Sequence, residues 1–328
     1  MKIFVTTAPF GQKNSLPIEI LDNSGFNYEI NSTGRRLSEQ ELFNIIPNYD
    51  AVIAGTERIS RELMEQSPRL KFISRVGIGV DGIDLNAARD LGVAVSYTPD
   101  APSPAVAELT IGLMLNLLRG ISFADSQLKG SAGWSRIMGR RLSEVTIGVV
   151  GVGRIGARVL RRLSIFGSPR ILVNDVQTIP DNVVPQLKLE WCDKEALLAQ
   201  SDLVSLHVPL TTKTRNMIDK DQLLRMRSDA FLINTARGGL INEKALSEVL
   251  HDGHLAGAAI DVFEEEPYTG SLLEAPRTLL TCHMGSMTED CRSRMEIEAT
   301  NECVRFLKHG SQSQPVPDFE YELQSCLG

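Results

Sequence analysis

Cysteine and long apolar runs are both scarce in this 328-residue sequence. The five cysteines form no Cys-x-x-Cys pair, so neither a disulfide framework nor a structural zinc site is expected. No window approaches the roughly 18 apolar residues of a membrane span, and the apolar part of MKIFVTTAPFGQ is too short for a secretory signal. We therefore expect a cytoplasmic protein without a metal or membrane partner, in which all cysteines are reduced: Cys192, Cys282, Cys291, Cys303 and Cys326.

Clustered positive charge is also missing from the sequence. The formal net charge is -7 at pH 7, the sequence pI is about 5.4, and Lys and Arg form no long run. A phosphate-backbone partner is therefore disfavoured, and we expect no nucleic acid. Hydrophobic residues make up 42% of the chain, which is enough apolar material for large cores. The length exceeds that at which one core keeps growing, so two domains are expected.

The first hundred residues alternate short β-like runs with helical patterns. A possible capping box spans Ser38 to Glu41, and Ser60 opens another helical pattern. The apolar runs between these patterns predict buried parallel strands: KIFVT (2–6), AVIAG (51–55), KFISRV (71–76) and VAVSY (93–97). This part of the chain is therefore predicted to be an α/β domain of its own.

A helix of about 15 residues is predicted after the prolines at 99, 102 and 104. Its apolar residues fall on two stripes, so it should be buried on more than one side. A core helix between two domains and a subunit interface are both compatible with this pattern. The stripes are Val106, Leu109, Leu113 and Leu117, and Ile111, Leu115 and Leu118.

A second β/α series begins near Val145. Strands separated by helical patterns imply right-handed crossovers and a doubly wound parallel sheet. A last helix is expected from Thr288 to about His309, followed by a polar tail. The predicted strands are TIGVVG (146–151), ILVND (171–175), LVSLHVP (203–209), AFLINTA (230–236), LAGAAIDV (255–262) and RTLLTCH (277–283).

The segment GVVGVGRIGARVL (148–160) contains a GxGxxG pattern between a strand and a helix. Gly151 permits a tight turn, Gly153 lets the backbone approach a pyrophosphate, and Gly156 lets the helix pack closely on the strand. The amides near Arg154 and Ile155 would face the phosphates at the positive end of the helix dipole. This context predicts a dinucleotide site.

Asp175 ends the following strand, 19 residues after Gly156. A carboxylate at this position can accept hydrogen bonds from the adenosine ribose and would repel a 2′-phosphate, so NAD is favoured over NADP. The alternative to a dinucleotide site is a glycine turn that binds no ligand, with Asp175 as an ordinary surface residue.

Three polar residues lie at the ends of predicted strands of this sheet or in the loops after them: Arg237, Glu266 and His283. Ligands gather outside the carboxyl ends of strands in an open α/β sheet, so these loops can converge on the cofactor. Hydride transfer at a carbon bearing oxygen needs a proton donor or acceptor, which histidine provides, while arginine binds a carboxylate. Each residue also has a structural alternative. Arg237 would cap a strand end or pair with a surface acid, Glu266 would be a solvated charge of the acidic run 264–266, and His283 would be a half-buried imidazole whose hydrogen bonds are satisfied.

Four motifs in chain order resemble the D-isomer-specific 2-hydroxyacid dehydrogenase family. The resemblance covers nearly the whole chain, and two further segments, RVGIGVDGIDL (75–85) and YTPDAPSPAVAELTIGLML (97–115), look most like the 3-phosphoglycerate dehydrogenase branch. No regulatory domain fits after residue 310. The four motifs are HVPLTTKTRNMI (207–218), FLINTARGGLINEKAL (231–246), DVFEEEP (261–267) and TCHMGS (281–286).

The resemblance implies an NAD-dependent oxidoreductase acting on CH–OH groups, which moves hydride between nicotinamide and C2 of a small 2-hydroxy or 2-oxo acid. The leading candidate substrate is 3-phosphoglycerate. Arg237 would anchor the substrate, Glu266 would hold the histidine, and His283 would be the general acid/base. Cys282 stands where the family usually has proline. The remaining cofactor-lining positions implied by the family are His207, Thr235, Ala236 and Asp261.

The family also implies the domain organisation. Residues 1–98 and 286–328 would form a discontinuous, flavodoxin-like substrate-binding domain, and residues 99–285 an NAD-binding Rossmann domain, with a cleft between the two. The amides of Val76, Gly77, Ile78 and Gly79 would hold the substrate carboxylate. Arg75 would either hold a substrate phosphate or be structural. The long helix after the prolines would help to build a homodimer.

Two other functions are compatible with the same fold. The C-terminal-binding corepressors keep the NAD site but work mainly by binding peptides and proteins, and a phosphite-type dehydrogenase oxidises a small inorganic anion. Formate-type relatives replace the glutamate with glutamine, whereas Glu266 is present here. Turnover of 2-oxo acids with NADH would distinguish an enzyme from a corepressor-like protein.

Overall fold

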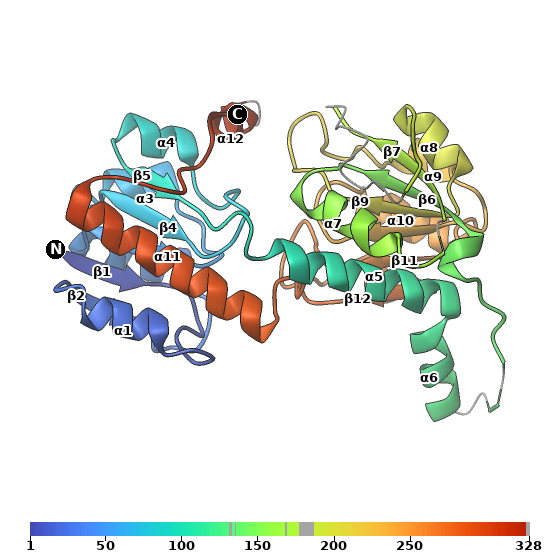
Figure 1. Cartoon of the computed structure of the whole chain (residues 1–328), viewed down its shortest axis with the longest axis horizontal. Helices are drawn as coiled ribbons and strands as arrows, with labels where there is room; N and C mark the ends of the chain where they lie inside the picture. Colours follow the sequence, from blue (N-terminus) through green and yellow to red (C-terminus); the bar gives the residue numbers. More distant parts are fainter. Residues whose placement is uncertain (131–132, 135, 168, 177–186, 326–328) are drawn as a thin grey trace. The chain divides into compact units, whose positions relative to one another are not determined.

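The structure is a computed structural model that describes residues 1–130, 133–134, 136–167, 169–176 and 187–325 (Figure 1). The chain divides into two compact units. Unit 1 consists of Met1–Pro102 and Met287–Gly328, and unit 2 of Ser103–Ser286. Each unit contains one parallel sheet covered by helices, so the predicted α/β class with two Rossmann-like sheets is confirmed.

Unit 1 contains a five-stranded sheet in the order β2-β1-β3-β4-β5, with all neighbours parallel. The order reverses between β1 and β3, which defines the topological switch point of this sheet. Its elements are β1 (Lys2–Val5), α1 (Leu16–Asp22), β2 (Asn27–Ile30), α2 (Glu39–Ile45), η1 (Ile46–Asn48), β3 (Ala51–Ala54), α3 (Arg61–Glu65), β4 (Phe72–Arg75), α4 (Leu85–Asp90), β5 (Ala94–Ser96), α11 (Glu289–His309) and α12 (Asp318–Ser325).

Helices cover both faces of the unit 1 sheet. The long helix α11 packs across β3 and β4 (Figure 1). Phe306 of α11 stacks on Phe72 of β4 with ring centroids 4.3 Å apart, and the hydroxyl of Ser74 donates to the carbonyl of Ala299 over 2.8 Å. On the opposite face α2, α3 and α4 bury apolar side chains in a common core with the sheet, among them Leu42, Leu63 and Leu85.

Several elements of unit 1 were not predicted individually from the sequence, among them α1, α4 and the edge strand β2. The expected polar tail contains a further helix, α12, that was not predicted. Gln324 of α12 donates to the carbonyl of Ile83 over 2.8 Å, and the guanidinium of Arg89 lies 4.2 Å from the centre of the Tyr321 ring. The C-terminal segment is therefore docked on α4 by contacts that depend on tertiary structure.

Unit 2 contains a seven-stranded parallel sheet in the order β12-β11-β10-β9-β6-β7-β8. The order reverses between β6 and β9, as in dinucleotide-binding folds. Its elements are α5 (Ser103–Arg119), α6 (Ile121–Lys129), η2 (Leu142–Glu144), β6 (Thr146–Val150), α7 (Arg154–Leu163), β7 (Arg170–Asn174), β8 (Leu189–Trp191), α8 (Lys194–Gln200), β9 (Leu203–Leu206), α9 (Lys220–Arg225), β10 (Phe231–Asn234), α10 (Glu243–His251), β11 (Gly257–Ile260), η4 (Ser271–Leu273) and β12 (Thr278–Leu280).

Two cores stabilise unit 2. One core joins the sheet to α5 and α7, and the other joins it to α8, α9 and α10. In α5, Leu113 and Met114 belong to the first core, and the hydroxyl of Thr110 lies 2.9 Å from that of Thr235 after β10. By contrast, α6 buries no residue within the described chain (Figure 1).

Four cysteines are free thiols, and the fifth, Cys326, lies outside the described residues. Cys303 is buried and Cys282 is exposed. No single described helix is long and apolar enough to cross a membrane; α5 and α6 reach the required composition only as a pair bent by 60°.

Candidate active site

Three neighbouring strands of the unit 2 sheet lead into the loops that carry the predicted catalytic residues. The strands β10, β11 and β12 are parallel and in register, with Asn234 opposite Ile260 and Ile260 opposite Leu280. Arg237 follows β10, Glu266 follows β11 and His283 follows β12. Because parallel strands end at the same edge of a sheet, these three loops occupy one edge of unit 2.

His283 and Glu266 are in direct contact. The Nδ1 atom of His283 lies 2.9 Å from Oε2 and 3.0 Å from Oε1 of Glu266. Oε1 also accepts a hydrogen bond from the amide of Phe263 over 3.1 Å, which fixes the carboxylate. The side chains of His283 and Glu266 are 46% and 34% exposed, so a small molecule can reach the imidazole.

The loop that carries His283 is held by Asp261. Oδ1 of Asp261 accepts from the hydroxyl of Thr281 over 2.5 Å and from the amide of Met284 over 2.9 Å, and Oδ2 accepts from the amide of Gly285 over 3.0 Å. The amide of His283 donates to the carbonyl of Asp261 over 2.8 Å. One buried carboxylate therefore fixes both sides of the histidine. Sequence reasoning had placed Asp261 near the nicotinamide and had missed this contact.

Arg237 lies in a loop that is held by hydrogen bonds within the loop and to Asn234 at the end of β10. Its Nη1 donates to the carbonyl of Ala236 over 2.7 Å, and Nδ2 of Asn234 donates to the carbonyl of Arg237 over 2.8 Å. A Cβ added to Gly238 would lie 2.0 Å from the carbonyl carbon of Phe263. Gly238 therefore lets this loop pack against the loop that carries Glu266.

The glycine loop follows β6 at the switch point of the sheet. A Cβ added to Gly151 would lie 2.6 Å from the carbonyl oxygen of His207, and one added to Gly156 would lie 2.1 Å from that of Gly151. A Cβ added to Gly153 would meet no atom within 4 Å, so this glycine faces open space. As N-cap of α7, Gly153 offers no side-chain acceptor to the first-turn amides, at the helix end that favours an anion. This geometry suits a pyrophosphate.

Asp175, which follows β7, lies against the glycine loop. Its Oδ2 accepts a hydrogen bond from the amide of Val152 over 2.6 Å. The carboxylate is thus fixed beside the loop, where it would approach the ribose of a bound dinucleotide. The bond to Val152 was not foreseen from the sequence.

His207 follows β9, on the other side of the switch point. Its Nε2 lies 2.9 Å from the hydroxyl of Ser205. Burial lowers the pKa of His207 to about 4, so the ring is neutral at pH 7. Its buried Nδ1 has no hydrogen-bond partner within the described chain. A buried polar atom normally has a hydrogen-bond partner, so a water or a group of a bound ligand would satisfy Nδ1.

Thr235 and Ala236 lie between β10 and Arg237. Both are buried, and the amide of Ala236 donates to Oδ1 of Asn234 over 3.0 Å. Thr235 contacts Thr110 of α5, so the end of β10 is tied to the helix that covers the sheet. Of the predicted residues of unit 2, the structure brings Glu266 and His283 into contact and packs the loops of Arg237 and Glu266 together.

The predicted carboxylate-binding loop belongs to unit 1 and follows β4. Two of its amides are used inside the unit: Val76 donates to the carbonyl of Ala54 over 2.9 Å, and Gly77 donates to the hydroxyl of Thr98 over 2.8 Å. No other described residue accepts from the amides of Ile78 and Gly79. The sequence had suggested four amides for the substrate carboxylate, and only those of Ile78 and Gly79 are left without an acceptor in the described chain.

Arg75 precedes this loop and folds back onto it. Its Nε donates to the carbonyl of Gly79 over 2.9 Å, and its Nη1 donates to the carbonyl of Val76. The guanidinium thus shapes the loop, in agreement with the structural alternative for this arginine. No cluster of three or more potential metal ligands occurs among the residues that the structure describes.

Comparison with known proteins adds independent information. A family model described as "D-isomer specific 2-hydroxyacid dehydrogenase, NAD binding domain" matches residues 111–285. A D-3-phosphoglycerate dehydrogenase of Methanocaldococcus jannaschii is 41% identical over 280 residues, which are 84% of this chain and 52% of the relative. The chain therefore spans about half the length of this relative.

Other relatives match over most of their length. A hydroxypyruvate reductase of Thermotoga maritima is 36% identical over 85% of this chain and 92% of its own. The crystal structure of a Thermus thermophilus protein matches with a TM-score of 0.87 and 32% identity, covering 97% of this chain and all of that one. These matches confirm the family, the oxidoreductase class and the NAD-binding domain that the motifs predicted.

Proposed function

Because the chain belongs to the D-isomer-specific 2-hydroxyacid dehydrogenase family and is an NAD-dependent oxidoreductase, we propose that it interconverts a small 2-hydroxy acid and its 2-oxo acid. The contact between His283 and Glu266 carries this proposal. A histidine paired with a carboxylate at the edge of a dinucleotide-binding sheet is equipped for proton transfer next to a hydride acceptor.

The glycine loop and its neighbours would hold NAD. Gly151, Gly153 and Gly156 allow the pyrophosphate to approach α7, and Asp175 would approach the adenosine ribose and disfavour a 2′-phosphate. His207, Thr235 and Ala236 would line the remainder of the site, while Asp261 would act through the loop that it fixes. When bound, NAD⁺ would accept a hydride from C2 of the 2-hydroxy acid, and NADH would donate one to C2 of the 2-oxo acid.

His283 is the proposed general acid/base. Glu266 engages Nδ1, so Nε2 is the nitrogen that exchanges a proton with the substrate oxygen. The carboxylate fixes the orientation of the ring and stabilises the positive charge on the imidazole when both nitrogens are protonated. In the direction of reduction, His283 would give a proton to the oxygen on C2, and in the direction of oxidation it would take that proton.

Two groups are proposed to bind the substrate. Arg237 offers a planar guanidinium that can bind the carboxylate and polarise the C2 carbonyl. In unit 1 the amides of Ile78 and Gly79 would receive the carboxylate, and Arg75 would keep their loop in place through its bonds to Val76 and Gly79.

The identity of the acid is the finer part of the proposal. The sequence motifs favour 3-phosphoglycerate, and several relatives are named as dehydrogenases of this acid, whereas others are named as reductases of hydroxypyruvate or glyoxylate. All of these acids share the carboxylate and the oxygen on C2 that Arg237 and His283 would contact, and they differ in the substituents beyond C2.

We also propose that the protein is a homodimer. The sequence had suggested an interface on the long helix after the prolines, which is α5; because α5 contributes to a core of unit 2, we propose the following helix, α6, as the interface instead. Three side chains of α6 are exposed and apolar, and they fall on more than one face of the helix, which buries no residue within the described chain. Exposed apolar residues follow in the segment after the helix. The residues are Ile121, Phe123 and Leu128, then Trp134 and Met138.

The activity is tested by following NADH oxidation with glyoxylate, hydroxypyruvate, pyruvate and 3-phosphohydroxypyruvate. Turnover of at least one acid is expected, with NADPH used less well than NADH because of Asp175. Binding of NADH without turnover of any acid would contradict the proposal and favour a corepressor-like role in protein binding.

A further inference from the structure

Glu57 is a buried acid at the switch point of the unit 1 sheet. It follows β3, whose neighbour β1 is followed by Thr6, and these are the two strands between which the order of the sheet reverses. In open α/β sheets, ligands bind outside the carboxyl ends of the strands at this point. The fold therefore places Glu57 where a ligand of unit 1 is expected.

The carboxylate of Glu57 is held on one side only. The hydroxyl of Thr6 donates to Oε2 over 2.7 Å and in turn accepts from the amide of Gly55 over 3.1 Å. No described residue donates a hydrogen bond to Oε1. Gly55 is needed here because a Cβ at this position would lie 2.9 Å from Oε2. The residue is only 3% exposed, so an acceptor oxygen is almost enclosed without a protein donor.

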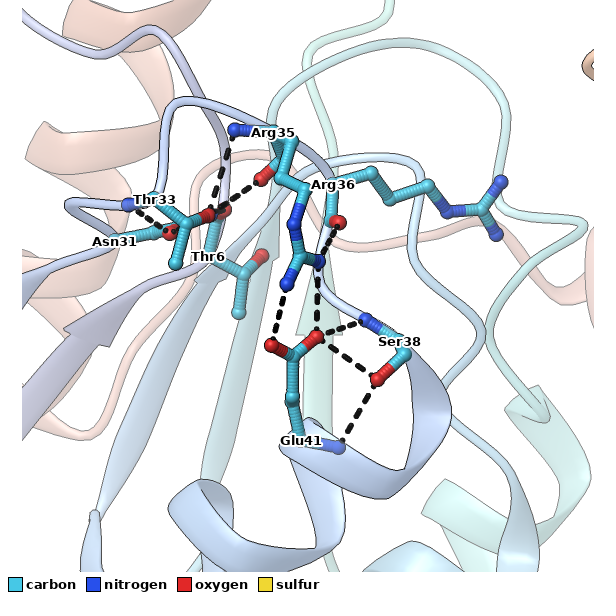
Figure 2. A network of polar contacts seen from close by, with 7 residues as sticks. All are labelled: Thr6, Asn31, Thr33, Arg35, Arg36, Ser38 and Glu41. Atoms are coloured by element: carbon cyan, nitrogen blue, oxygen red, sulfur yellow. Dashed lines mark hydrogen bonds and ion pairs between the residues drawn. The ribbon is translucent and has the colours of Figure 1, made fainter.

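No lysine or arginine forms an ion pair with Glu57 in the described chain. The arginine of the loop after β2, Arg35, is instead closed onto Glu41, with nitrogen to oxygen distances of 2.7 and 3.0 Å (Figure 2). The guanidinium of Arg75 is bonded to the carbonyls of its own loop. Neither of these two guanidinium groups therefore forms an ion pair with Glu57.

Glu57 lies one strand away from the proposed carboxylate-binding loop. Ala54 at the end of β3 is in register with Arg75 at the end of β4, and the amide of Val76 donates to the carbonyl of Ala54. Neighbouring strands are about 4.8 Å apart, a spacing comparable with the length of a three-carbon acid. An acid whose carboxylate is bound by Ile78 and Gly79 can therefore direct its third carbon toward Glu57.

On this basis, and resting on the proposed function, we propose that Glu57 determines specificity for the substituent on C3. Its free carboxylate oxygen accepts a hydrogen bond from a hydroxyl group and repels a phosphate. The preferred substrates are thus small 2-oxo acids with a neutral donor at C3, or with no C3 substituent, and phosphorylated acids are disfavoured. This differs from the substrate that the sequence motifs suggested.

The test measures kcat/KM with NADH for hydroxypyruvate and for 3-phosphohydroxypyruvate. The wild-type protein should prefer hydroxypyruvate by on the order of 100-fold, since apposition of like charges in a site costs several kcal/mol. Glu57→Gln, which removes the charge and keeps the shape, should reduce this ratio at least roughly tenfold. The exposed Glu65→Gln is the matched control and should leave the ratio unchanged.

Glu57→Asp keeps the charge with a shorter reach and provides a second variant in case the glutamine fails to fold. It should retain the poor use of the phosphorylated acid while its KM for hydroxypyruvate rises. A wild-type preference for the phosphorylated acid, or a ratio that Glu57→Gln leaves unchanged, would overturn the role of Glu57 without affecting the proposed activity.

Loss of the proposed activity is recognised separately, by the lack of turnover with every acid. The preference is then measured as the rise in Tm that each acid causes in the presence of NAD⁺, because a ligand that binds the folded state stabilises it. A larger rise with hydroxypyruvate supports the role of Glu57, and an equal or larger rise with the phosphorylated acid overturns it.

Discussion

At the scale of single residues, His283 adopts an unusual backbone conformation. Its φ is 48°, in the left-handed region, which costs a non-glycine residue on the order of 1 kcal/mol or more. The surrounding bonds from Asp261 and Glu266 hold it there. Strain of this kind is retained where the direction of a side chain matters more than local stability.

Replacement of His283 by alanine should reduce kcat by roughly 10² to 10⁴, the usual contribution of a general acid/base. The measurement is steady-state NADH oxidation with the best acid of the panel. His251→Ala, which alters an exposed histidine at the end of α10, is the control and should retain activity. If His283→Ala kept more than about half of kcat, another group would have to transfer the proton.

Arg237→Ala should lower kcat/KM by about 10² to 10³, because the guanidinium would bind both the substrate and the charge that develops on its oxygen. Arg225→Ala, at the exposed end of α9, serves as the control. Both variants are compared by kcat/KM for the same acid, and equal values for Arg237→Ala and the wild type would remove Arg237 from the site.

The roles of single residues could be inferred from the sequence only in part. Glu266 and His283 could be paired because their motifs follow neighbouring strands of one sheet. The bond from Val152 to Asp175, the close contact of Gly238 with Phe263 and the position of Glu57 could not, since each depends on how two loops pack in three dimensions. No local pattern of residues reports such contacts.

At the scale of elements, the segment 281–285 acts as a small scaffold for the imidazole. Asp261→Asn replaces two acceptor oxygens by one, so at least one backbone N–H loses its acceptor in a buried place, which costs about 1 to 3 kcal/mol of unfolding free energy. We expect kcat to fall by roughly tenfold because the imidazole is displaced, with a smaller change in KM.

The two effects of Asp261→Asn are measured by chemical denaturation and by the dependence of kcat on pH. A displaced imidazole should shift the pH profile as well as the rate, whereas a purely structural change would lower stability alone. An unchanged pH profile together with normal kcat would show that Asp261 does not position His283.

Long apolar elements could be predicted from their pattern, and short polar ones could not. The runs that became β6 and β10 are almost continuous in apolar residues, which matches their burial in the sheet. The missed strands β2 and β8 have the sequences NYEI and LEW, lie at sheet edges and keep exposed or half-buried residues. Their strand conformation comes from pairing with a neighbour, which the local sequence does not encode.

At the scale of the whole molecule, α6 provides a test of assembly. Phe123→Glu places a charge on its exposed apolar surface, and we expect the wild-type protein to behave as a dimer and the variant as a monomer in light scattering after gel filtration. Leu224→Glu, a comparably exposed leucine on α9, is the control and should remain dimeric. A monomeric wild type, or a dimeric Phe123→Glu, would exclude this surface as the interface.

The α/β class of both sheets could be read from alternating patterns, but the full strand order could not. Neither β2 nor α12 gives a strong signal, yet β2 completes the order that puts the switch point beside Glu57. The sequence motifs therefore point to candidate residues in unit 2, whereas the position of Glu57 in unit 1 depends on the strand order, which no local motif encodes.

The return of the chain to unit 1 sets an order of events during synthesis. The helix α11, which covers β3 and β4, is synthesised after the whole of unit 2. Unit 2 is continuous, so its sheet and both cores can form while that helix is still being made. Until α11 is made, the nascent first unit lacks the helix that covers Phe72, so we expect this face of its sheet to stay exposed during that interval.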